Sequence, residues 1–143
     1  MGLSERETII ETVNKLFIYT DEQQWEKLLS EVFNESVYMD MTSLGADASN
    51  LSSREICDNW ENAFSGLDAI NHLAGNYLVS ISENSATVYC YATATHYKAD
   101  AVNGKTREFV GTYDLDLVKT EIGWRIHKFK YNLKYMNGNI ELE

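Results

Sequence analysis

The chain has 143 residues, a net charge of −10 and 44% hydrophobic residues, which is typical of one globular domain with its own core. The negative charge argues against nucleic-acid and anionic-membrane partners, because phosphate groups bind to basic surfaces. No apolar run reaches the roughly 18 residues of a membrane-spanning helix, and the first residues lack the pattern of a secretory signal. We therefore expect a cytoplasmic protein.

The chain contains only two cysteines, Cys57 and Cys90, which lie far apart and form no C-x-x-C pair. We expect both to be buried thiols, without a disulfide or a metal ion. The sequence also lacks a glycine-rich phosphate loop, so it predicts no cofactor.

The first part of the chain predicts two helices in succession. Ser4 and Glu7 form the S-x-x-E pattern of a helix start, and apolar residues then recur at helical spacing to about Tyr19. Asp21 is expected to cap the second helix, whose apolar stripe includes Trp25.

A short strand and a third helix should follow. The stretch 36–42 is predicted to be the strand, and the polar stretch 44–53 is predicted to be a loop. Ser52 or Ser53 can begin the helix, and Trp60 should lie on its buried face.

In the second half of the chain, apolar and polar residues alternate with a period of two, which is typical of strands. Asn103 and Gly104 form a hairpin signal between two of these strands. The four strands should be antiparallel, and we expect them at 71–82, 86–99, 107–119 and 124–135.

Helices that precede a block of strands predict an α+β fold in one domain, residues 1–143. Three helices can cover one face of a curved, mostly antiparallel sheet. A hollow between the sheet and the helices would be a place for a small-molecule ligand.

His96 is the most informative of the three histidines. It shares its strand face with the small apolar residues at positions 86, 88, 90, 92 and 94, which suits the concave wall of a pocket. It is therefore either a core histidine with one hydrogen bond or an acid–base group. His72 also has two interpretations, either an ordinary loop or edge histidine or a site residue. Asp21 can cap a helix and still face the pocket.

Four segments, in this order, carry a resemblance: YTDEQQWEKL (19–28), NHLAGN (71–76), ATHYKAD (94–100) and GWRIHKFKYNLKYMNGN (123–139). Together they resemble SnoaL-like proteins of the NTF2-like superfamily, on the branch near scytalone dehydratase. The resemblance covers about residues 4–139 and implies a cone-shaped α+β barrel with an internal cavity, often in a homodimer or homotrimer.

The resemblance also implies a set of site residues. Asp21, four residues before Trp25, matches an aspartate that pairs with a histidine at the position of His96. His72 matches the second histidine of the site. Six further positions are expected to contact the substrate, namely Tyr19, Tyr38, Met41, Trp60, Thr112 and Asp114.

Two of these positions differ from the dehydratase. Two tyrosines of that enzyme hold the water that polarises the substrate carbonyl, and Thr20 and Met41 stand at the matching positions here. Tyr19 and Tyr38 are the tyrosines nearest in sequence.

These residues predict a cofactor-independent dehydratase, isomerase or cyclase for a small cyclic or aromatic carbonyl compound. Asp21 would fix the tautomer of His96, His96 would remove a proton next to the carbonyl, and His72 would protonate the leaving hydroxyl or the enolate oxygen.

Two other functions remain open. The protein could bind a small ligand without turnover, which the missing tyrosines favour. It could also be an association module, because one face of the sheet is rich in aromatic residues. The tyrosines assigned to that face are Tyr89, Tyr91, Tyr97 and Tyr113.

Overall fold

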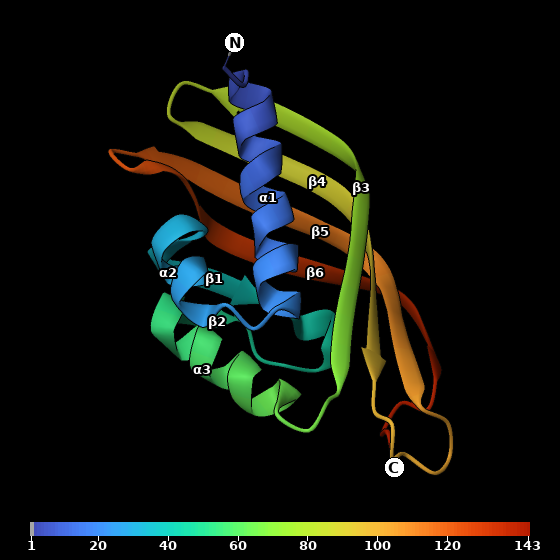
Figure 1. The fold of residues 1–143 in the computed structure, drawn as a ribbon. Coiled ribbons are helices and arrows are strands. Elements are labelled where there is room, and N and C mark those ends of the chain that lie inside the picture. Colours follow the sequence, from blue (N-terminus) through green and yellow to red (C-terminus); the bar gives the residue numbers. More distant parts are fainter. Residues whose placement is uncertain (1) are drawn as a thin grey trace.

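Three helices lie on the concave side of a curved sheet in the computed structural model, which describes residues 2–143 (Figure 1). Over these residues the elements are α1 (Glu5–Asp21), α2 (Trp25–Glu31), β1 (Phe33–Asp40), a 3₁₀ turn η1 (Thr42–Leu44), β2 (Ser49–Ser52), α3 (Ser53–Phe64), β3 (Ala69–Ser82), β4 (Ser85–Tyr97), β5 (Thr106–Thr120) and β6 (Gly123–Gly138).

The sheet has the strand order β2-β1-β6-β5-β4-β3, with β2 and β3 at its edges. All neighbouring strands are antiparallel except β1 and β6, which are parallel. The predicted α+β fold with a mostly antiparallel sheet is therefore confirmed. Over residues 2–143, no helix combines the length and the apolar character needed to cross a bilayer.

Helix α1 begins as the sequence predicts. The Glu7 amide donates to Ser4 Oγ at 3.1 Å, and the Ser4 amide donates to the Glu7 carboxylate at 2.8 Å. This reciprocal capping box satisfies two amides that have no partner inside the helix. The buried face of the helix, which includes Ile9 and Val13, then crosses the sheet.

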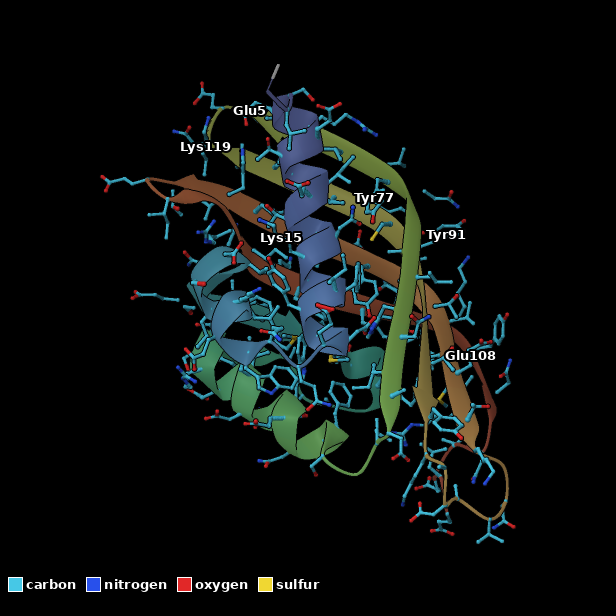
Figure 2. All side chains as sticks on the ribbon, in the orientation of Figure 1. Glu5, Lys15, Tyr77, Tyr91, Glu108 and Lys119 are labelled. Carbon is cyan, nitrogen blue, oxygen red and sulfur yellow. The ribbon has the colours of Figure 1, made fainter. Side chains whose placement is uncertain are left out.

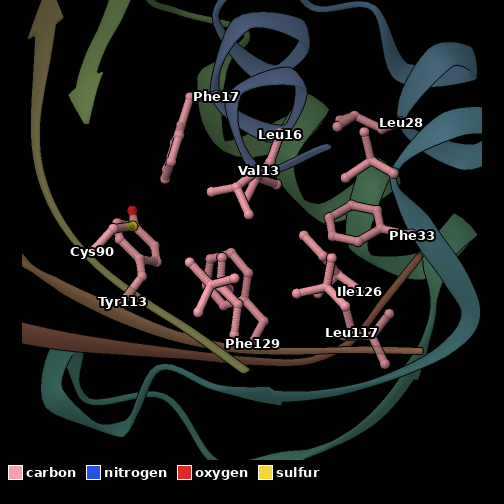
Figure 3. Packing of buried hydrophobic residues seen from close by; sticks show 14 of the residues in the cluster. Val13, Leu16, Phe17, Leu28, Phe33, Cys90, Tyr113, Leu117, Ile126 and Phe129 are labelled. Atoms are coloured by element: carbon pink, nitrogen blue, oxygen red, sulfur yellow. The ribbon is translucent and has the colours of Figure 1, made fainter. Parts of the chain in front are cut away.

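The core lies between this helix face and the central strands. Figure 3 shows Val13 and Leu16 of α1 above Phe129 and Ile126 of β6, with Leu28 of α2 beside them. All five side chains are buried. Burial of one such side chain stabilises the fold by roughly 1.5–3 kcal/mol, so this packing fixes how the helices sit on the sheet.

The alternation predicted for β4 is present. The residues of β4 that face the helices are buried from Ala86 to His96, and their neighbours Tyr91 and Tyr97 are exposed. Cys57 and Cys90 are buried free thiols, as predicted. Burial raises their pKa to about 11 and about 12, respectively.

Two expectations about the first half of the chain are wrong. Residues 49–52 form the strand β2, which pairs with β1, although the sequence there is polar and looks like a loop. Asp21 is the last residue of α1 and does not cap α2, whose N-cap is Gln24 without a side-chain hydrogen bond. In both places pairing with another element, β1 for residues 49–52 and β3 for Asp21, overrides the local pattern.

Gly111 of β5 leaves space that another side chain occupies. It lies opposite Ala92 on the concave face, between Phe109 and Tyr113. A Cβ atom at this position would lie 2.6 Å from Tyr131 Oη and would also collide with the carbonyl oxygen of Asn132. The absence of a side chain therefore lets the Tyr131 ring extend over β5.

The substitution Gly111→Ala should lower the free energy of unfolding by roughly 1–3 kcal/mol, because the methyl group collides with a backbone oxygen. Gly75→Ala is the matched control on β3, where an added Cβ meets nothing within 4 Å, and it should change stability by less than about 0.5 kcal/mol. Urea unfolding of both variants measures the difference. Equal stabilities would contradict the packing described for Gly111.

Candidate functional site

A cavity of about 280 Å³ lies between the helices and the concave face of the sheet. Its wall is mainly aromatic and aliphatic, with contributions from α1, α3 and the central strands. A concave, mostly apolar pocket with a few polar groups is the usual form of a small-molecule site. The polar or titratable side chains in its wall are Thr20, His72, His96, Tyr113 and Tyr131.

His72 is held against the end of α1 by Asp21. The His72 amide donates to Asp21 Oδ2 at 2.8 Å, and His72 Nδ1 lies 2.5 Å from Asp21 Oδ1. The Phe17 ring stacks on the imidazole with 5.4 Å between the centroids. Because the carboxylate accepts at Nδ1, the neutral ring carries its hydrogen there and leaves Nε2 as an acceptor for a ligand.

His96 has the opposite tautomer. Arg107 Nε donates to His96 Nδ1 at 2.9 Å. A guanidinium has no acceptor, so His96 Nδ1 must carry the lone pair and Nε2 must carry the hydrogen. Burial, followed by the positive charge of Arg107, lowers the pKa of His96 to about 4. His96 is therefore a neutral hydrogen-bond donor at neutral pH.

The pairing of Asp21 with His96 that the sequence suggested is not found, because Asp21 contacts His72. Helix α1 packs against the edge strand β3, which carries His72. His96 lies one strand further into the sheet, opposite Arg107 on β5. The two histidines therefore belong to separate pairs, His72 with Asp21 and His96 with Arg107, and both imidazoles line the same cavity.

The six predicted substrate contacts divide into two groups. Met41 and Trp60 line the cavity, together with Thr20. Tyr19 and Tyr38 are not among the lining residues. Tyr19 donates to a carboxylate oxygen of Glu31 at 3.2 Å, and Tyr38 is 37% exposed.

Thr112 and Asp114 lie on the other face of the sheet. Side chains alternate along a strand, and Tyr113 between them faces the cavity. Both accept hydrogen bonds from the Asn132 side chain, at 3.2 Å and 2.8 Å. The side chains of Thr112 and Asp114 therefore point away from the cavity, and neither residue lines it.

Two residues of the cavity region were missed in the sequence. Arg107 faces His96 directly across the hairpin at residues 98–105, so pairing the strands around Asn103 and Gly104 could have located it. Tyr131 lies two residues after Phe129 on β6, so both side chains are on the same face of the strand and line the cavity. No simple pattern distinguishes it from a core aromatic residue.

A metal site is not part of this arrangement. Across residues 2–143, no group of three or more His, Cys, Asp or Glu side chains is placed to hold a metal ion.

The pKa of His96 leads to a prediction about pH. The folded value of about 4 lies below the ordinary value of 6.5, so the unfolded chain binds more protons between these values and acid favours unfolding. The stabilising contribution is full above about pH 6.5 and should fall by roughly 3 kcal/mol as the pH decreases to about 4.

The substitution His96→Asn keeps an acceptor for Arg107 but removes the titrating ring. Urea unfolding at neutral pH and near pH 4 should show a smaller loss of stability in this variant than in the unchanged chain. If both chains lose the same amount, His96 is not held neutral.

Comparison with known proteins identifies a family. The model of the SnoaL-like domain matches residues 1–130. None of the curated protein sequences matches significantly.

Solved structures resemble the whole chain. The Kfla4162 protein from Kribbella flavida is 24% identical, with a TM-score of 0.90 over 96% of this chain and 95% of that chain. A proposed scytalone dehydratase from Novosphingobium aromaticivorans is 15% identical, with a TM-score of 0.82 over 94% and 87%. A proposed dehydratase of the NTF2-like family from Streptomyces avermitilis is 12% identical, with a TM-score of 0.79 over 92% and 97%. At these identities the likeness shows the shared NTF2-like fold alone.

Proposed function

The chain belongs to the SnoaL-like domain family, and we propose that its cavity binds a small cyclic or aromatic carbonyl compound and removes a proton from the carbon next to the carbonyl. The reaction would be that of a cofactor-independent lyase or isomerase. The contact between Asp21 and His72 at the wall of an apolar cavity is the observation that carries this proposal.

His72 is the general base of the proposed reaction. Its Nε2 takes the proton from carbon, and the electron pair of the C–H bond forms the enolate. The Asp21 carboxylate stabilises the positive charge that the imidazole gains, and it holds the ring in one orientation. The sequence had suggested His96 for this role, and the placement of Asp21 favours His72.

His96 stabilises the enolate oxygen. Its Nε2–H donates to the oxygen as negative charge develops there, and Arg107 places a full positive charge behind the ring. A donor fixed before the reaction costs no reorganisation when the charge appears. The Phe64 and Phe109 rings, each 5.4 Å from the His96 ring, keep this donor in a weakly polar environment.

The fate of the enolate decides the type of reaction. In an isomerase the proton on His72 returns to a different carbon. In a dehydratase the C–O bond of a hydroxyl group beta to the carbonyl breaks, the oxygen leaves with the proton from His72, and one water is lost. Two of the similar structures carry dehydratase names, which favours the second outcome, although one fold hosts many functions.

Deuterium exchange into the ketone α-tetralone, followed by proton NMR in D₂O, tests the proton transfer without a known substrate. The chain should accelerate exchange at the carbon next to the carbonyl. His72→Gln and Asp21→Asn should reduce the rate by roughly 10²–10⁴-fold, the usual contribution of a general base.

Asp116→Asn makes the same chemical change as Asp21→Asn on the other face of the sheet, and it should leave the rate unchanged. Circular dichroism of each variant verifies folding. Binding of α-tetralone without any accelerated exchange would support the alternative function, a ligand-binding protein without turnover.

We further propose that the chain assembles as a homodimer or homotrimer through the sheet face turned away from α1. Large apolar side chains on that face are exposed, including Leu73 at 71%, Leu78 at 69% and Tyr91 at 43%. Figure 2 shows Tyr91 and Glu108 projecting from this face. Exposed apolar patches of this kind are common at protein interfaces. The proposed partners are thus a small ligand and further copies of the chain, and the cytoplasmic location stays a prediction.

Light scattering after size-exclusion chromatography measures the assembly. The double substitution Leu73→Glu and Tyr91→Glu should shift the mass from a multiple of the chain to that of one chain, because buried carboxylates would lack partners. Val102→Glu changes an 87% exposed loop residue and should leave the mass as it is. A single-chain mass for the unchanged protein would refute the assembly.

A further inference from the structure

Tyr131 has a polar group that the proton-transfer chemistry does not use. The residue is only 4% exposed, yet its side chain lines the cavity. Among residues 2–143, its hydroxyl is the buried side-chain oxygen or nitrogen without a hydrogen-bond partner. A buried hydroxyl without a partner is costly to the fold, so its presence at a cavity wall calls for an explanation.

Three other polar side chains of the wall each have a hydrogen-bond partner within the chain. His72 is bonded to Asp21, and His96 is bonded to Arg107. Thr20 Oγ1 donates to the carbonyl of Leu16 at 2.6 Å. The Tyr131 hydroxyl differs from these three side chains, because it has no hydrogen-bond partner within the chain.

The surroundings hold the Tyr131 ring in place. The Tyr113 ring packs against it with 4.9 Å between the centroids, and the missing side chain of Gly111 provides the room for its Oη atom. Burial raises the pKa of Tyr131 to about 12, so the phenol stays protonated and can donate at neutral pH.

The strand register separates this hydroxyl from His96. Tyr131 Oη lies over Gly111, whereas His96 pairs with Arg107, four residues earlier on β5. At about 3.3 Å per residue, these two positions are roughly 13 Å apart along the strand. His72 pairs with Ala94, which pairs with Phe109, so the base lies at the level between them. The two donors therefore lie at different levels along the strands, one on each side of His72.

We propose that Tyr131 donates a hydrogen bond to a second oxygen of the ligand, at the end opposite the oxygen bound by His96. The substrate class is then a ring compound with oxygen functions at both ends and an apolar middle. This inference rests on the proposed function for the position of the first oxygen, and the binding of the second oxygen can be measured independently of any reaction.

Isothermal titration calorimetry with two probes tests the proposal. The probes are α-tetralone and a hydroxytetralone with its hydroxyl on the aromatic ring, opposite the carbonyl. The unchanged chain should bind the hydroxytetralone roughly three- to ten-fold more tightly, the value of one net hydrogen bond. Tyr131→Phe should abolish this preference and leave the affinity for α-tetralone unchanged.

Thermal unfolding without ligand separates binding from a structural role. Because the hydroxyl has no partner in the chain, Tyr131→Phe should leave the melting temperature unchanged or raise it. Tyr89→Phe, on the opposite face of the sheet, should keep both the preference and the stability. A preference that persists in Tyr131→Phe, or a lower melting temperature of that variant, would overturn the proposal.

The two proposals can fail separately. Accelerated deuterium exchange without a Tyr131-dependent preference would retain the base and remove the second subsite. A Tyr131-dependent preference without exchange would retain the subsite in a protein that binds but does not react.

Discussion

The contact between the Asp21 carboxylate and His72 ties the last residue of α1 to the edge strand of the sheet. His72 donates two hydrogen bonds to this carboxylate, one from its backbone amide and one from its ring. The first fixes where the helix ends against the strand, and the second fixes the ring tautomer. The position of the helix and the chemistry of the imidazole therefore depend on one side chain, which makes Asp21 a structural and a chemical constraint at once.

The two imidazoles of the cavity differ because their partners carry opposite charges. The Asp21 carboxylate accepts the hydrogen of His72 Nδ1 and leaves Nε2 as an acceptor, whereas the Arg107 guanidinium donates to His96 Nδ1 and leaves Nε2 with the hydrogen. The same side chain can therefore accept a proton at one position and donate a hydrogen bond from a neutral ring at the other. The two histidines thus differ in role because of their partners on the neighbouring elements, Asp21 for His72 and Arg107 for His96.

The sequence predicted features that depend on near neighbours in the chain. The capping box of Ser4 and Glu7, the alternation along β4 and the inward face of His96 all follow from local periodicity. The sequence did not predict features that depend on a partner far away in the chain. Asp21 resembles a helix cap as long as the position of His72 is unknown. Arg107 was missed for the same reason, since its role exists only in the register of β4 against β5.

The fold can contain a cavity because the tightly packed part of the core lies to one side of it. Toward α2 and β1, large side chains such as Leu28, Phe33 and Ile126 pack together (Figure 3). Around the cavity, Ala63 of α3 and Ala94 of β4 supply little volume to the wall, and wall atoms without neighbours forfeit dispersion energy. The filled part can stabilise the fold against this loss. A small residue on the concave face thus has a structural meaning that alternation alone does not reveal, because it marks a place where the core is not filled.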